Sequence, residues 1–354
     1  MIADRRAENE TMTTTTTSQE PDDRNFDPSG FGRQLGFYLE LAKARLAALV
    51  VLTTIVGYVL AARGSFDLSL LGWTVLGTTL TAFGANILNQ WLEADRDGRM
   101  ERTRNRPLPA GYVSRRKALA WGLASAVAGL VVLDLGTNRL TAGLSLFVIL
   151  LYVVVYTPLK VRTPLNTAVG ALCGAIPPMM GWTAATGQLE LGAWILGGIL
   201  FIWQVPHFLA LAWMYREDYA RGGFRMMPEA DPDGSITGRA AFINAIALLP
   251  ITGALAAAGV TGMTYLVFSQ VVGLAFAALG LTFARRRIRL TARRLFLASI
   301  IYLPVLLGLM VSDMDDRLAR LAGIEIPRTT RIVNDLPITR PVVDTGPVHP
   351  TAGR

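Results

Sequence analysis

A run of polar side chains interrupts an otherwise apolar chain between Asn86 and Pro109. Within it, Asn89, Glu93 and Asp97 follow one another at intervals of four residues. On a continuous helix such residues lie along one face, about 80° apart from the first to the last. A few oxygen ligands that leave room for water and phosphate suit Mg²⁺ better than zinc or a redox metal. The spacing therefore predicts a magnesium site.

The same run continues into a loop rich in arginine, whose planar guanidinium groups bind phosphate oxygens. The arginines that follow the acidic residues are Arg99, Arg102, Arg104 and Arg106. Two interpretations are open. Either the loop binds a phosphorylated substrate beside the metal, or its positive charge only sets the orientation of a membrane protein. The regular spacing of the oxygen ligands favours the first.

The elements that must position these residues are long and apolar. Of 354 residues, 52% are hydrophobic and only 17% are charged, which excludes an ordinary soluble domain. A helix needs about 20 apolar residues to cross a bilayer. Such stretches are expected at 43–62, 68–92, 118–135, 141–158, 166–186, 191–214, 240–258, 263–284 and 295–312. The sequence therefore predicts an all-α integral membrane protein with nine transmembrane helices.

The linkers between these stretches alternate in charge, which predicts the orientation in the membrane. Four of them, 93–117, 159–165, 215–239 and 285–294, together contain 20 lysine and arginine residues. The four short linkers contain only Arg63 and Arg139. Because basic loops stay in the cytoplasm, the N-terminus and the basic loops are expected there, and an odd number of spans sends the C-terminus to the opposite side.

Three regions are expected along the chain. Residues 1–35 lack the apolar core of a signal peptide and are predicted to be a disordered cytoplasmic tail, 36–312 the membrane domain, and 313–354 an extramembrane extension. The single cysteine, Cys173, excludes an intramolecular disulfide framework. The arginines within 285–294 indicate orientation or contact with anionic membrane lipid. No nucleic-acid partner is predicted.

A second stretch, from Phe201 to Pro228, also takes an apolar helix into charged residues. His207 lies inside its apolar part, four residues after Trp203. Such a histidine is either a packing residue or a functional one, and charged groups at membrane depth, which cost about 2.5–3.5 kcal/mol, tend to be functional. Pro206 also weakens the local backbone ladder and leaves a carbonyl free toward a cavity. We therefore favour a functional histidine.

The order Asn-x-x-x-Glu-x-x-x-Asp, followed by residues 100–107, resembles the first signature of the UbiA-type intramembrane prenyltransferases. That signature is usually NxxxDxxxD, and here Glu93 stands at a usual Asp. The resemblance implies a bundle of helices around a central cavity, with a prenyl diphosphate held through Mg²⁺. The family's second signature, DxxxD, is incomplete because Met214 lies four residues before Asp218. A second metal site therefore stays open.

Further motifs resemble the protoheme IX farnesyltransferase branch of that family, also called the haem O synthases. They are Trp203-Gln204-x-Pro206-His207-Phe208, Asp218-Tyr219, Met227-Pro228, Tyr156-Thr157-x-Leu159-Lys160, Arg162-Thr163, Pro177-Pro178 and Gly181-Trp182. The resemblance covers about residues 36–312. It implies an enzyme of the cytoplasmic (inner) membrane that transfers a farnesyl group from farnesyl diphosphate to a vinyl group of haem B, adds water and releases haem O and diphosphate.

The resemblance also implies roles for particular residues. The implied catalytic residues are Asn89, Glu93 and Asp97 as ligands of Mg²⁺, with Arg102, Arg106 and Lys160 balancing the diphosphate charge. The implied substrate-binding residues are Arg45, Arg162, Trp203, His207, Asp218 and Tyr219. For His207, contact with the haem iron and contact with a propionate both stay open. A haem A synthase or oxidase assembly factors are the implied protein partners.

Two alternatives remain at this point. The same fold can prenylate an aromatic quinone precursor, but such an enzyme should carry the second aspartate pair and has no need of His207. A non-enzymatic ion-coupled transporter is the other alternative. It should place its ionisable residues near the middle of the bilayer, whereas here they gather at the ends of the predicted spans.

Overall fold

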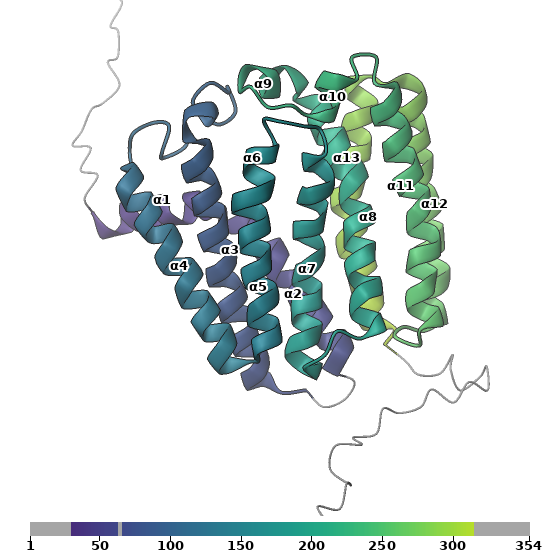
Figure 1. Cartoon of the computed structure of the whole chain (residues 1–354). Coiled ribbons are helices and arrows are strands. Elements are labelled where there is room, and N and C mark those ends of the chain that lie inside the picture. Colours follow the sequence, from purple (N-terminus) through teal and green to yellow (C-terminus); the bar gives the residue numbers. More distant parts are fainter. Residues whose placement is uncertain (1–29, 63–65, 315–354) are drawn as a thin grey trace, which may run out of the picture.

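The computed structural model describes residues 30–62 and 66–314, and every regular element in these ranges is a helix (Figure 1). Nine segments of this part of the chain are long and apolar enough to cross a membrane. They are α2 (Ala44–Ala62), α3 (Leu68–Asp97), α4 (Arg115–Gly136), a composite segment (Arg139–Leu159), α7 (Asn166–Thr186), α8 (Leu191–Met214), α11 (Ser235–Ala257), α12 (Met263–Arg286) and α13 (Arg289–Ser312). The predicted all-α fold with nine spans is confirmed.

At one end of the bundle the helices continue beyond the apolar stretches of the sequence. α3 runs on to Asp97 instead of residue 92, α11 begins at Ser235 instead of 240, and α13 begins at Arg289 instead of 295. The added turns carry polar side chains, so the apolar limit marks where lipid contact ends and not where the helix ends. The short helices α9 (Arg216–Arg221) and α10 (Met227–Ala230) lie at this same end (Figure 1), which we call the basic end.

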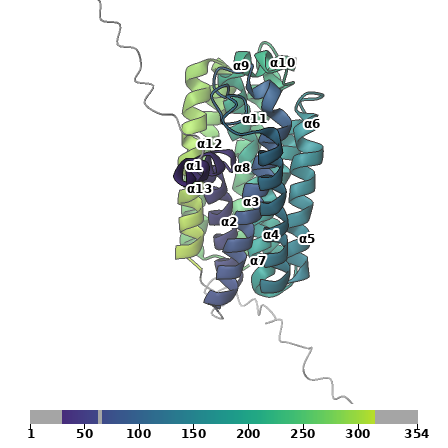
Figure 2. The ribbon, with the colours of Figure 1, turned by 90° about the vertical axis from the view of Figure 1, so that its left-hand side faces the viewer.

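A short helix, α1 (Phe31–Leu41), precedes the first span and runs across the bundle (Figures 1 and 2). It includes residues 31–35, which the sequence predicts as part of the tail. Residues 1–29 of that tail lie outside the described residues. So do residues 315–354, nearly all of the predicted extension. Two side chains of α3 hold the last turn of α1. Asn86 Nδ2 donates to the Ala42 carbonyl at 2.9 Å, and Gln90 Nε2 donates to the Leu41 carbonyl at 2.7 Å.

α7 is the central helix, since 72% of its spanning window is buried, more than in any other span. α2 crosses it in backbone contact. A Cβ atom on Gly57 would lie 2.0 Å from the Pro178 carbonyl oxygen, and one on Gly181 would lie 1.8 Å from the Thr54 carbonyl oxygen. Glycines at a crossing let membrane helices approach this closely. The crossing therefore fixes the position of α2 and of Lys43, the residue just before it.

The last span closes the bundle onto the first. α13 packs against α8 and α12 and also reaches α2. Its contact with α8 includes a buried hydrogen bond, in which Trp203 Nε1 donates to the Ser299 carbonyl at 3.0 Å. The boundary between α8 and α13, which we call the α8–α13 seam, is thereby held by a directional contact as well as by packing.

Candidate active site

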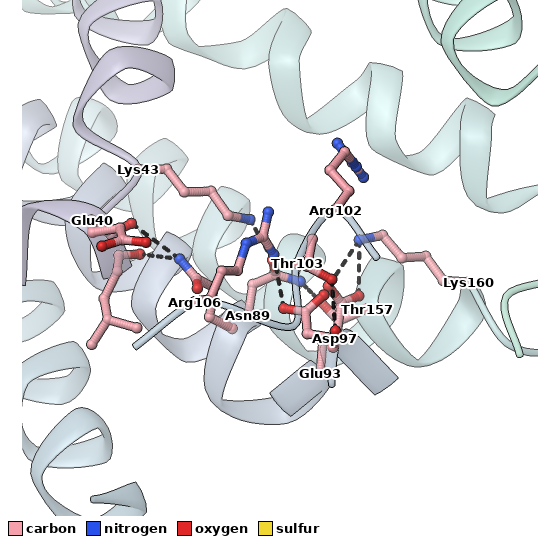
Figure 3. A network of polar contacts seen from close by, with 12 residues as sticks. Glu40, Lys43, Asn89, Glu93, Asp97, Arg102, Thr103, Arg106, Thr157 and Lys160 are labelled. Atoms are coloured by element: carbon pink, nitrogen blue, oxygen red, sulfur yellow. Dashed lines mark hydrogen bonds and ion pairs between the residues drawn. The ribbon is translucent and has the colours of Figure 1, made fainter. Parts of the chain in front are cut away.

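The polar residues of α3 form a buried cluster at the basic end (Figure 3). Because α3 stays helical to Asp97, Asn89, Glu93 and Asp97 lie along one face, and their exposed fractions are 0%, 5% and 3%. Isolated carboxylates are costly to bury, so each needs a cation or several donors. We call these three residues and the three cations that bind them the α3 cluster.

Each oxygen-bearing residue of the cluster is bound by a different cation from another element. Lys160 Nζ lies 2.8 Å from Glu93 Oε1 and 3.2 Å from Oε2. Arg106 Nη1 lies 2.8 Å from Asp97 Oδ2. The third cation is Lys43, whose Nζ donates to Asn89 Oδ1 at 2.8 Å. The side chains therefore converge on one spot from α3, from the loop after it, from the end of the fourth span and from the residue before α2.

Lys43 is a site residue that sequence reasoning missed. It lies between α1 and α2 with φ of 50°, in the left-handed region that non-glycine residues seldom occupy. Burial, with the nearby charges of Arg106 and Lys160, lowers the pKa of Lys43 to about 7. The predicted residue Arg45 is instead exposed on α2. Only the break between α1 and α2 turns position 43 inward, and no sequence pattern marks it.

The orientation of Asn89 is fixed by a residue that the sequence did not single out for this role. Asn89 Nδ2 donates to Thr157 Oγ1 at 2.9 Å, and Thr157 Oγ1 donates to the Tyr152 carbonyl at 2.8 Å. The single hydroxyl proton of Thr157 is thus used, so its oxygen accepts from the amide. The Asn89 carbonyl oxygen is consequently the atom turned toward Lys43.

A π-helical turn places Thr157 there. The fourth span consists of α5 (Arg139–Leu150), the π-helix η1 (Leu151–Tyr156) and α6 (Thr157–Leu159). Such turns are rare inside helices and are often found at functional sites. Lys160 follows directly. Burial acts to lower the pKa of Lys160, but the adjacent Glu93 carboxylate and the hydroxyls of Tyr156 and Tyr152 raise it overall, so the ammonium is charged when it meets Glu93.

Asp218 does not stand in the α3 cluster but joins two loops of the basic end. The backbone N–H of Glu101 and Arg221 Nη2 both donate to Asp218 Oδ1 at 2.9 Å. Burial acts to raise the pKa of Asp218, yet the bonds from Arg221 and from the Glu101 backbone lower it overall. Asp218 Oδ2 is enclosed without a hydrogen-bond partner among the residues that the structure describes. Its Oδ1 therefore holds α9 against the loop after α3.

Arg102 and Tyr219 meet beside this junction. Arg102 Nη2 lies 3.4 Å from the Tyr219 hydroxyl, and its guanidinium lies over the rings of Tyr215 and Tyr219 at 5.2 and 5.6 Å. Arg102 is exposed and points away from the α3 cluster (Figure 3). Arg162 is also exposed, and the described contacts do not bring it to the cluster. Of the cations predicted to balance the diphosphate charge, Arg106 and Lys160 therefore lie in the α3 cluster and Arg102 does not.

A cavity of about 650 Å³ opens among these loops. It is lined by Glu101, Arg102, Trp213, Met214, Tyr215, Arg216, Glu217, Asp218, Arg221, Arg287, Ile288 and Arg289. Five of these residues are arginines, and the walls come from the loop after α3, the end of α8, α9 and the start of α13. We call it the basic pocket. Arg221 and Arg287 are paired with carboxylates, so the guanidinium groups of Arg102, Arg216 and Arg289 are the ones that favour an anionic ligand.

His207 lies in the α8–α13 seam among aromatic rings. Its Nδ1 is 2.7 Å from Ser299 Oγ, and its ring centroid is 5.3 Å from that of Trp203 and 4.8 Å from that of Phe296. Trp203 is buried, with 5% of its surface exposed, whereas His207 is partly exposed. The predicted pair is thus in stacked contact, and Trp203 is anchored through its ring nitrogen to α13.

The α3 cluster fits a magnesium ion that is shared with a substrate. In the part of the chain that the structure describes, no group of three or more His, Cys, Asp or Glu side chains gathers to hold a metal. Two carboxylates and one amide oxygen are too few for a closed protein cage. They suit Mg²⁺, which keeps several waters and binds through one or two carboxylates and substrate phosphates.

Comparison with known proteins shows the family of this chain. Residues 50–301 match the UbiA prenyltransferase family. The chain is 43% identical over 285 residues to the protoheme IX farnesyltransferase of Solibacter usitatus (strain Ellin6076), covering 78% of this chain and 98% of that protein. It is 44% identical over 277 residues to the mitochondrial protoheme IX farnesyltransferase of Homo sapiens, covering 78% of this chain and 62% of the human protein.

A solved structure supports the same fold. The UbiA homologue from Archaeoglobus fulgidus bound to DMAPP and Mg²⁺ matches with a TM-score of 0.60 at 13% identity, over 78% of this chain and 99% of that one. The chain belongs to the UbiA prenyltransferase family, a class of membrane enzymes. Within it, the chain belongs to the protoheme IX farnesyltransferases, the name that both relatives carry. Membership of an enzyme family removes the transporter alternative.

Proposed function

We propose that this chain transfers the farnesyl group of farnesyl diphosphate to a vinyl group of haem B, with addition of water, to give haem O and diphosphate. The observation that carries the proposal is the α3 cluster, in which three buried oxygen-bearing side chains are each bound by a cation. The names of relatives at 43% and 44% identity supply the acceptor.

The α3 cluster would receive the diphosphate. Glu93, Asp97 and the Asn89 amide oxygen would hold Mg²⁺, whose Lewis acidity stabilises the negative charge of the leaving diphosphate. Arg106, Lys160 and Lys43 each lie within 2.8 Å of a cluster oxygen, so small rotations bring their N–H groups onto phosphate oxygens instead. Once turned onto the phosphate oxygens, these N–H groups would stabilise the negative charge that develops on the leaving diphosphate, which lowers the barrier.

The remaining steps need a nearby acceptor and one water molecule. The C–O bond to diphosphate breaks, and a vinyl carbon of the haem forms a C–C bond with the allylic cation. Water then gives its oxygen to the resulting cation and releases one proton. The α8–α13 seam holds the stacked rings of Trp203 and His207, and such flat rings suit contact with a flat macrocycle. We propose Trp203 and His207 as the residues that contact it.

We further propose that the basic end faces the cytoplasm, as the excess of lysine and arginine in its loops favours. α13 starts at this end and crosses the bundle, which takes Ser312 to the opposite side. A reporter fused after Arg104 should then read cytoplasmic, and one fused after Gly187 should read external. The reverse pattern would contradict a cytoplasmic diphosphate site. Transfer of the product to a haem A synthase or an oxidase assembly factor is part of the same proposal.

The direct test is an assay of the purified full chain in detergent with farnesyl diphosphate, haem B and Mg²⁺. Chromatography and mass spectrometry should show haem O, which should disappear on chelation of the metal and in a Glu93→Gln variant. The matched acceptor control is an aromatic quinone precursor, which should remain unprenylated. Prenylation of that compound with no conversion of haem B would contradict the proposal.

A further inference from the structure

We infer that His207 binds the haem iron through Nε2, that Ser299 fixes the tautomer that makes this possible, and that the haem propionates occupy the basic pocket. The inference rests on the proposed function, because it takes haem B as the acceptor. It decides between iron and propionate as the partner of His207, which the sequence leaves open.

The hydroxyl of Ser299 has one proton and two close polar neighbours. Its Oγ lies 2.6 Å from the Phe296 carbonyl oxygen and 2.7 Å from His207 Nδ1. Both distances require a shared proton, and a carbonyl oxygen carries none. The single hydroxyl proton of Ser299 must therefore lie toward Phe296. The proton between Ser299 and His207 must then belong to Nδ1.

The other ring nitrogen of His207, Nε2, is left without a proton in this arrangement. A neutral imidazole with its proton on Nδ1 has an electron pair on Nε2. Nε2 makes no hydrogen bond with any residue in the described ranges, and the ring is partly exposed. A lone pair binds a metal, and histidine bound to iron typically donates its second N–H to a partner that sets the ring orientation. In this neutral tautomer the same nitrogen has no proton to offer a carboxylate, which favours the iron over a propionate as its partner.

Ser299 holds both sides of this arrangement. Its hydroxyl accepts from His207, and its backbone carbonyl accepts from Trp203 Nε1 at 3.0 Å. The indole is thus fixed against the imidazole, with an angle of 26° between the rings. One residue of α13 therefore sets the direction of the nitrogen ligand and the position of the flat side chain next to it.

The carboxylate edge of a haem bound at His207 would reach the basic pocket. Met214 lies two turns after His207 on the same face of α8, about 10 Å along the axis, and it lines the basic pocket. On α13, Arg289 lines the pocket and lies two turns before Phe296, which packs on His207. The seam therefore leads from the histidine to the pocket. A haem lying along it with its iron on His207 carries its propionates toward guanidinium groups.

The iron contact is tested by comparing haem B with metal-free protoporphyrin IX. The purified full chain should bind haem B more tightly, and His207→Ala should abolish that preference while leaving farnesyl diphosphate binding unchanged. Free imidazole should restore the spectrum of a histidine-bound haem to this variant. Equal affinity of the unmodified chain for the two macrocycles, or a histidine-bound spectrum in His207→Ala, would overturn the inference.

The positioning role of Ser299 is tested with Ser299→Ala. Loss of the partner of Nδ1 should weaken haem B binding by about ten- to a hundredfold, shift the iron–histidine stretching band and leave protoporphyrin IX binding unchanged. Ser299→Thr, which keeps the hydroxyl, should restore the band. The matched control is Ser269→Ala, since Ser269 is equally buried and its hydroxyl also donates to the carbonyl three residues back. An unshifted band in Ser299→Ala would overturn the assignment.

The propionate site is tested with haem dimethyl ester. Arg289→Gln should weaken binding of haem B and leave binding of the ester unchanged, whereas Arg293→Gln, on the same helix outside the pocket lining, should change neither. Equal loss for acid and ester would contradict the pocket assignment.

Two outcomes separate this inference from the proposed function. If the unmodified chain forms no haem O, the proposed function fails. If it forms haem O while His207→Ala keeps its histidine-bound spectrum, this inference alone fails.

Discussion

The α3 cluster and the α8–α13 seam both orient a side chain that offers an electron pair, and they do so with different chemistry. In the α3 cluster, three cations bind the side-chain oxygens of Asn89, Glu93 and Asp97. In the seam, aromatic rings and a neutral hydroxyl surround His207. Charged groups are costly at membrane depth, so paired charges suit a site whose ligand is itself charged. The face of a neutral macrocycle needs no charged partner.

The two regions nevertheless share one device. Thr157 and Ser299 each donate their only proton to a carbonyl of their own span and accept from the side chain that they orient. Such a hydroxyl is a fixed acceptor, which fixes the Asn89 amide in one region and the His207 tautomer in the other. The comparison predicts that each hydroxyl serves one substrate and that damage in one region spares the other.

The largest expected effect is loss of a charged ligand in the α3 cluster. Asp97→Asn keeps the shape of the side chain but removes the charge, so turnover should fall by about a hundred- to a thousandfold, as for loss of a group that stabilises developing charge. Initial rates at limiting Mg²⁺ measure this. Haem B titration of the same variant is the control and should be unchanged. Near-normal activity would show that Asp97 is not a ligand.

The next effect is on stability. Lys160→Met leaves the Glu93 carboxylate buried without its cation, which should destabilise the protein by about 3 kcal/mol. This value is near the low end for a broken buried pair, because the Lys160 side chain is 15% exposed. Thermal unfolding in detergent measures it, and the double variant Lys160→Met with Glu93→Gln should recover most of the loss. The exposed pair of Arg221 and Glu101 is the control, and Glu101→Gln should leave the unfolding temperature nearly unchanged.

A smaller effect distinguishes the two hydroxyls. Thr157→Val keeps the volume and removes the acceptor of Asn89, so farnesyl diphosphate binding should weaken by about ten- to a hundredfold while haem binding is unchanged. Thr157→Ser should retain most of the affinity. Isothermal titration with both substrates gives the comparison with Ser299→Ala. If either variant weakens both substrates equally, the two regions are not independent.

The smallest effect separates two neighbouring cations. Lys43→Met removes a donor from the α3 cluster and should weaken farnesyl diphosphate binding by about tenfold, the value of one hydrogen bond to a charged group. Arg45→Met, an exposed change two residues away, should stay within about twofold. The same titration measures both. Equal losses would mean that the break between α1 and α2 does not select Lys43.

The sequence predicts the spans and the α3 face well because both follow from short-range periodicity. Asn89, Glu93 and Asp97 are four residues apart, and α3 keeps its helix to Asp97. Lys43, and the partner roles of Thr157 and Ser299, were not predictable in this way. Lys43 depends on a left-handed residue, Thr157 on a π-turn, and Ser299 on a contact with a residue 92 positions away. None of these leaves a local pattern.

The cation on each oxygen of the α3 cluster has a consequence for how the metal arrives. A bare Mg²⁺ would add two positive charges beside two lysines and an arginine and would have to displace them from the oxygens that they bind. A diphosphate brings the negative charge onto which those side chains turn. The metal and the isoprenoid should therefore bind as one unit, so that magnesium affinity measured without donor is weak and the resting protein does not compete for the ion in the cell.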